Sequence, residues 1–141
     1  VRALAKKNHT AQLLMTIPGI GPITAMFIIA EVDDISRFRS YRNLASYAGL
    51  VPSLDASAGK EKRGRITKQG SRYLRTALVE AAQAAARMKN CRVRIFFRRR
   101  IVKAGYQKAI VATAHKILQY AFYVWKNQTP YQETYPVCVT R

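Results

Sequence analysis

The chain has 141 residues, with 25 Lys or Arg against 7 Asp or Glu, which gives a formal net charge of +18. One core with a helical extension fits this length, and self-repulsion of this size indicates an acidic partner, most often nucleic acid. No apolar run is long enough for a bilayer, and residues 1–10 lack the pattern of a signal peptide, so no membrane partner is expected. Cys91 and Cys138 stand far apart with no nearby ligand pair, which is typical of free thiols in a cytosolic protein. The first residue is Val rather than Met, so we expect the chain to be the C-terminal part of a longer protein.

The first element expected is a helix over residues 2–15. Its apolar residues recur at helical spacing, and the predicted buried positions are Leu4, Ala11, Leu14 and Met15. The helix ends at residues 16–22, where two prolines and two glycines interrupt it.

A second helix follows, because residues 23–32 are nearly all apolar. A helix, a Pro-Gly-Ile-Gly turn and a second helix form the pattern of a helix-hairpin-helix motif, here over residues 13–30. Such a hairpin contacts one DNA phosphate through backbone amides and a helix N-terminus, without reading sequence. The candidate contacts are Gly19, Gly21 and Thr24. The alternative is a structural hairpin that packs and binds nothing.

Residues 33–50 predict a short turn capped by Asp34 or Ser36, then a helix that starts near Ser40 and stops at Gly49. Five apolar residues are spaced three apart, which favours a packing stripe over a stacking surface for bases. They are Phe38, Tyr41, Leu44, Tyr47 and Leu50.

A basic loop with three glycines spans residues 56–70 and leads into a helix. Glycine lets the backbone approach a ligand closely, and a loop that opens into a helix N-terminus offers amides and cations to a phosphate. The alternative is a solvated basic loop. The candidate nucleic-acid contacts are Lys60, Lys62, Arg63, Arg65, Lys68, Arg72 and Arg75.

The rest of the chain predicts three helices and a tail. From Ser71, the expected cap, the apolar positions Leu74, Ala77, Leu78, Ala81, Ala82, Ala85 and Met88 form one face. Residues 92–103 and 107–126 predict two more helices, separated at Gly105, and residues 128–141 predict a tail with little core. No segment alternates over strand lengths, so the predicted class is all-α: a helix-hairpin-helix, a basic loop and a bundle of amphipathic helices.

The ordered motifs resemble one family. After the hairpin come YAGLVP at 47–52, SAG at 57–59, GRITKQG at 64–70 and LRTALVEAA at 74–82. This order closely resembles the C-terminal domain of insertion-sequence transposases of the IS-one-ten and IS-one-sixteen type, the bridge-RNA-guided recombinases. The resemblance covers about residues 13–98. It implies a connector end at 1–12, a catalytic-serine domain at 13–105, a helix packed on it at 106–127 and a tail at 128–141.

The resemblance implies that Ser57 is the nucleophile that attacks a DNA phosphodiester and forms a phosphoserine linkage. Ala58 stands where the family usually has glycine, followed by Gly59. It also implies a preceding RuvC-like domain with four acids that bind a divalent metal such as Mg²⁺, whereas this fragment needs no cofactor. The implied partners are transposon-end and target DNA, a guide RNA and further copies of the protein. The implied location is the cytoplasm of a bacterium or archaeon, at the nucleoid.

The other serines, the acids and the histidines of the chain have simpler explanations than a catalytic role. Ser53 and Ser71 are explained as a turn residue and a helix cap, whereas Ser57 has no such explanation. The acids Asp33, Asp34, Asp55 and Glu61 have no spacing that would put metal ligands on one face, so no metal site is predicted. His9 and His115 lie in predicted helices, so the basic residues near Ser57 are expected to stabilise charge on it and on the phosphate. A non-catalytic nucleic-acid-binding module remains the alternative function.

Overall fold

The computed structural model describes residues 1–50, 71–89 and 91–132. Every regular element in these ranges is a helix, which confirms the all-α prediction. The elements are α1 (Arg2–Lys7), α2 (His9–Leu14), α3 (Pro22–Val32), a 3-10 turn η1 (Ile35–Arg37), α4 (Tyr41–Ala48), α6 (Arg72–Ala85), α7 (Arg92–Ala104) and α8 (Tyr106–Asn127).

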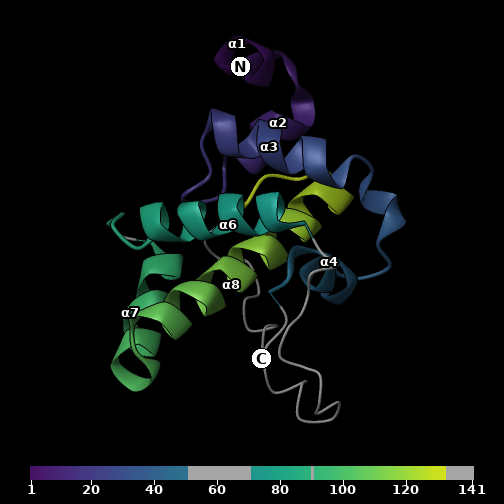
Figure 1. Ribbon diagram of the computed structural model, residues 1–141. Coiled ribbons are helices and arrows are strands. Elements are labelled where there is room, and N and C mark those ends of the chain that lie inside the picture. Colours follow the sequence, from purple (N-terminus) through teal and green to yellow (C-terminus); the bar gives the residue numbers. More distant parts are fainter. Residues whose placement is uncertain (51–70, 90, 133–141) are drawn as a thin grey trace.

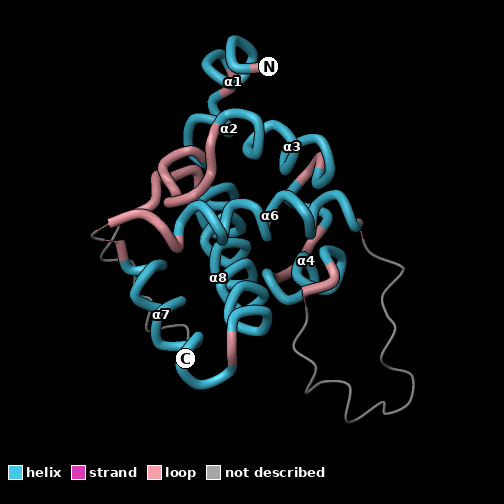
Figure 2. Tube along the Cα trace, turned by 60° about the vertical axis from the view of Figure 1, so that its left-hand side comes forward, coloured by secondary structure: helices cyan, strands magenta, loops and turns pink. Residues whose placement is uncertain are grey.

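The helix α8 is the centre of the fold, because α2, α4, α6 and α7 all contact it. Its buried face includes Ile110, Ala114, Ile117 and Leu118. Figure 1 shows α6 crossing near α8, with α1, α2 and α3 on the other side of α6. Figures 1 and 2 both place α7 and α4 on opposite sides of α8.

The single helix expected over residues 2–15 is wrong, because the structure has two short helices there. Asn8 interrupts them with φ −98° and ψ 118°, and its Oδ1 accepts a hydrogen bond from the amide of Ala11 at 2.9 Å. An N-cap of this kind starts a new helix and changes its direction. Leu4, predicted to be buried, is 60% exposed, and Ala5 is buried instead.

The middle of the chain follows the sequence prediction closely. Asp34 caps η1 by accepting a hydrogen bond from the amide of Ser36. Gly49 ends α4 in the left-handed conformation, at φ 72°. The predicted stripe packs as expected: Phe38, Leu44 and Leu50 are buried, and both tyrosines pack against the core.

Two predictions about the C-terminal half are wrong. Met88 is 42% exposed, because α6 already ends at Ala85. Residues after Asn127 were expected to contribute little core, yet Tyr131 is buried. Its ring lies 5.0 Å from that of Tyr120, and its amide donates to Oγ1 of Thr16 at 2.8 Å. This tail residue therefore holds the start of the α2–α3 turn against α8.

Candidate nucleic-acid interface

The turn between α2 and α3 is packed against α6. Gly19 has φ +93°, and a Cβ built on it would lie 2.2 Å from the carbonyl oxygen of Ala81. A side chain could not fit in that space, and the backbone conformation also favours glycine. Packing by itself therefore explains why residue 19 is glycine. This is what the alternative, a structural hairpin, requires. The helix-hairpin-helix motif stays a prediction.

The other two candidate residues of the hairpin lie at the start of α3. Gly21 is the N-cap of α3, and a Cβ built on it would meet nothing within 4 Å. Pro22 occupies the first turn, and Thr24 is half-exposed. This helix end is therefore accessible, and its free amides and dipole would suit an anion.

The helices on either side of segment 51–70 are joined by hydrogen bonds of Ser71. The amide of Ser71 donates to the carbonyl oxygen of Tyr47 in the last turn of α4, at 2.7 Å. The Ser71 hydroxyl donates to Oε1 of Glu31 in α3 at 2.6 Å and accepts from the amide of Leu74 at 3.0 Å. Ser71 is thus the N-cap of α6, as predicted, and it also joins α3, α4 and α6 at the return point of the segment.

The two arginines of α6 stand just beyond that return point. Arg72 and Arg75 are both exposed. The Nη1 atom of Arg75 would lie 2.8 Å from a Cβ built on Gly49, so its guanidinium lies over the C-terminal end of α4. A cation is favourable at a helix C-terminus because of the backbone dipole. Of the two predicted contacts, Arg75 therefore lies beside the C-cap of α4, and Arg72 opens α6.

The remaining predicted site residues lie outside the described residues. They are Ser57, Lys60, Lys62, Arg63, Arg65 and Lys68.

The hairpin and Arg72 lie at different places along α6. Gly19 packs against Ala81, whereas Arg72 is the first residue of the helix. The nine residues from Arg72 to Ala81 correspond to a rise of about 14 Å.

Two residues that organise this region were not predicted from the sequence. Glu31 has no role in the sequence prediction, and Tyr47 has one only as a member of the packing stripe. Their contacts with Ser71 join residues 40 and 24 positions away in the chain. No local pattern signals such contacts, although a carboxylate in an otherwise apolar segment indicates that a partner is needed.

Two kinds of site are not found in the described part of the chain. Within residues 1–50, 71–89 and 91–132, no three His, Cys, Asp or Glu side chains stand close enough to hold a metal ion. In the same ranges, no helix combines the length and apolar character that crossing a membrane requires.

Comparison with known proteins matches residues 11–98 to the Transposase IS116/IS110/IS902 family. The chain is 36% identical over 138 residues to the "Transposase for insertion sequence element IS1111A" of Coxiella burnetii, covering 96% of this chain and 37% of that protein. It is 34% identical over 128 residues to the "Pilin gene-inverting protein" of Moraxella bovis, covering 89% of this chain and 40% of that protein. A "Probable family 20 transposase" of Pseudomonas aeruginosa is 37% identical over 87 residues, which are 62% of this chain and 26% of that protein.

The helical fold, the basic sequence between α4 and α6 and the family match together point to a transposase domain. The chain belongs to the IS116/IS110/IS902 transposase family, because the family model covers more than half of it. It spans well under half the length of the relatives described above.

Proposed function

We propose that this chain is the part of a DNA transposase that binds the DNA backbone and supplies Ser57 as the nucleophile for strand cleavage and exchange. The observation that carries the proposal is that Ser71, the residue after segment 51–70, bonds to Tyr47 of α4, the helix before the segment, and to Glu31 of α3. A nucleophile must be positioned within a fraction of an ångström, and joined helices on either side of the segment give a rigid frame for such positioning.

The proposed reaction exchanges one phosphate ester for another. The Ser57 oxygen attacks the phosphorus, the bond from phosphorus to one sugar oxygen breaks, and a phosphoserine ester holds the cut strand. The serine loses its proton to a base, and the released sugar oxygen gains one. Attack by a sugar hydroxyl of another strand on this ester completes the exchange and restores the serine.

The cations near Ser57 in the sequence would stabilise the negative charge of the transition state. These are Lys60, Lys62, Arg63, Arg65 and Lys68, with Arg72 and Arg75 at the adjoining helix start. Fixed cations aimed at a developing charge are usually the largest source of such catalysis, and guanidinium groups can hold phosphate oxygens in pairs.

The whole protein's partners belong to the same proposal. The names of two relatives refer to an insertion-sequence element and to inversion of a pilin gene, and both describe rearrangement of DNA. We expect transposon-end and target DNA as substrates, a guide RNA, a further domain that binds Mg²⁺, and assembly of several copies in the cytoplasm.

The experiment that tests the proposal traps the covalent intermediate. Full-length protein is incubated with Mg²⁺, guide RNA and a DNA substrate that blocks strand exchange, and the protein–DNA adduct is mapped by peptide mass. An adduct on Ser57 that is absent in Ser57→Ala and retained in Ser53→Ala supports the proposal. Cleavage that survives in Ser57→Ala would leave the chain as a DNA-binding module, which is the alternative function.

A further inference from the structure

A line of basic side chains crosses the central helix. We name Arg42, His115, Lys116 and Arg100 the basic strip. Arg42 comes from α4, His115 and Lys116 from α8, and Arg100 from α7. Because α4 and α7 lie on opposite sides of α8 (Figure 2), the strip runs from one side of that helix to the other.

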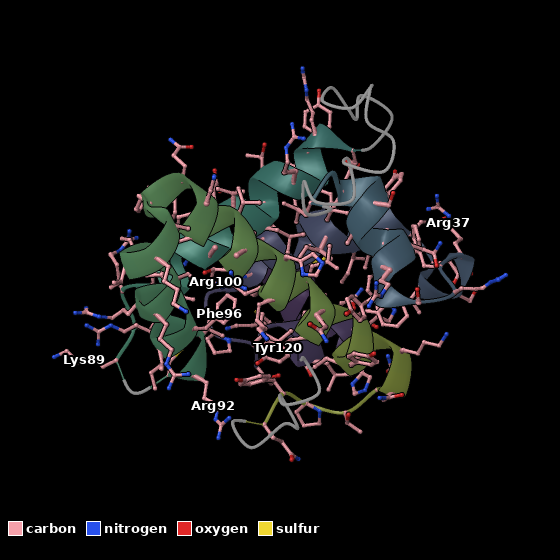
Figure 3. All side chains as sticks on the ribbon, turned by 90° about the horizontal axis from the view of Figure 1, so that it is seen from below. Arg37, Lys89, Arg92, Phe96, Arg100 and Tyr120 are labelled. Atoms are coloured by element: carbon pink, nitrogen blue, oxygen red, sulfur yellow. The ribbon has the colours of Figure 1, made fainter. Side chains whose placement is uncertain are left out.

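Aromatic rings connect the members of the basic strip. Arg42 lies over the Tyr41 ring, with Cζ 5.8 Å from its centroid, and the Tyr41 and His115 rings are 5.8 Å apart. Farther along, the Nζ atom of Lys116 is 4.7 Å and the Cζ atom of Arg100 is 5.1 Å from the centroid of the Phe96 ring. Figure 3 shows Phe96 and Arg100 close together where α7 meets α8. These contacts fix the positions of the cations.

The strip lacks acids that could neutralise it from its own helices. Residues 81–132 contain eleven Lys or Arg and no Asp or Glu, and α4 contains no acid either. Among the described residues, the acids are Glu31, Asp33, Asp34 and Glu80, which lie in α3, beside η1 and in α6. Of these, Glu31 accepts from Ser71 and Asp34 from Ser36, so both have partners elsewhere.

Burial and neighbouring cations both act on the two half-buried members of the strip. Burial and the neighbouring Arg100 lower the pKa of Lys116 below its usual value. Burial, Lys116 and Arg42 lower the pKa of His115 in the same way. The half-buried ammonium of Lys116, which faces Arg100, is unfavourable by itself, and a bound anion would relieve this.

We propose that the basic strip binds the phosphate backbone of duplex DNA, as a surface separate from the hairpin and from segment 51–70. Duplex DNA is favoured over single strands because the aromatic rings beside the strip already have cations over their faces. Phe96 is covered by Lys116 and Arg100, and Tyr41 by Arg42. Single-strand binding uses open aromatic faces for base stacking, whereas fixed cations suit the regular phosphates of a duplex.

Arg42 of the strip lies in α4, the helix that precedes segment 51–70 in the chain. The inference rests on the DNA-binding part of the proposed function and is independent of the role of Ser57.

The test compares two double variants with the same change in charge. Lys116→Gln with Arg100→Gln removes two cations from the strip. Lys126→Gln with Arg98→Gln is the control, because Lys126 also lies over a ring, that of Phe122 at 5.5 Å, near the far end of α8. Arg98 is exposed on α7, two residues before Arg100 and therefore about 160° around the helix from it.

Affinity of the full-length protein for a labelled 30-base-pair duplex (~100 Å) is measured without divalent metal over a range of salt. We expect the strip variant to bind several-fold more weakly, with a log–log salt slope about two units shallower, since each lost phosphate contact removes about 0.9. The control should stay near wild type. Lys116→Arg, which keeps the charge, should retain the slope, and thermal melts check that each variant folds.

Equal losses of affinity in both double variants would show an effect of net charge only and would overturn the proposal. Salt slopes equal to that of the wild type in both variants would also overturn it. A loss confined to single-stranded RNA or DNA of the same length would overturn the assignment to duplex DNA. If the wild-type protein itself failed to bind duplex DNA, the proposed function would be contradicted. Should the double variant unfold, the single exposed Arg100→Gln, with an expected slope loss of about one unit, decides the question.

Discussion

The Ser71 hydroxyl donates a hydrogen bond of 2.6 Å to Oε1 of Glu31, which joins the start of α6 to the last turn of α3 across 40 residues of chain. The same hydroxyl accepts from the amide of Leu74 and so caps α6. One side chain therefore fixes a helix end, links two helices and determines where segment 51–70 returns to the fold.

We predict that Ser71→Ala lowers the free energy of unfolding by about 1–2 kcal/mol, because the cap is lost and the carboxylate of Glu31 loses its donor. Urea unfolding followed by circular dichroism measures the change. Ser46→Ala is the matched control, since Ser46 is exposed within α4, and it should stay within about 0.5 kcal/mol of wild type. Equal effects of the two substitutions would contradict the role assigned to Ser71.

The two hairpin glycines should respond very differently to alanine. Gly19→Ala places a Cβ against the carbonyl of Ala81 in a backbone conformation that alanine rarely adopts, so we expect a loss of about 2–4 kcal/mol. Gly21→Ala has open space and a φ of −101°, so it should cost only about 1 kcal/mol, because alanine is a poorer N-cap than glycine. Thermal unfolding of both variants makes the comparison, and a stable Gly19→Ala protein would refute the packing of this turn on α6.

Because Gly21→Ala should leave the fold intact, it also tests the hairpin as a DNA-binding element. If the exposed end of α3 contacts a phosphate, the added methyl group should weaken duplex binding at a temperature where the variant is still fully folded. Fluorescence anisotropy gives the affinity. Unchanged affinity would favour the structural hairpin, which is the alternative that the packing of Gly19 already supports.

His115 should make stability depend on pH. Burial, Lys116 and Arg42 lower its pKa in the folded state, so the unfolded chain binds the proton more tightly. The contribution of neutral His115 is therefore fully present above the unfolded value of about 6.5 and is lost as the pH falls below it. The free energy of unfolding, measured between pH 8 and 5, should fall less steeply in His115→Gln than in wild type. Parallel curves would contradict this prediction. Tyr41, whose ring contacts His115, is present in both proteins, so the comparison isolates the imidazole of His115.

Tyr131, the buried residue of the tail, offers a further test. Tyr131→Ala removes a ring packed on Tyr120 and should cost about 2–4 kcal/mol, because the cavity cannot close fully. Tyr73→Ala is the control, since that ring is 61% exposed on α6 and should matter little. Chemical denaturation of the two variants separates the effects. If Tyr131→Ala were as stable as Tyr73→Ala, the tail would not support the hairpin.

Much of the helical fold was predictable because it depends on local spacing. The period of apolar residues placed α6, α7 and α8, and turn chemistry placed the stops at Gly49 and Gly105. The break at Asn8 was missed, although asparagine is a good N-cap, because the apolar period continues through it. Gly19 could be singled out as a special position, but whether it faces a ligand or another helix depends on what packs beside it.

The sequence by itself determined the charge, the helical class, the family and the candidate serine, since each is carried by residue type and order along the chain. Only the tertiary structure decided that Ser71 meets Glu31, that Tyr131 closes over the hairpin and that Arg42, His115, Lys116 and Arg100 form one line. These contacts join segments many residues apart, and their geometry is fixed by how α4, α6 and α7 pack on α8. Helix packing of this kind is set by whole surfaces, which no local pattern encodes.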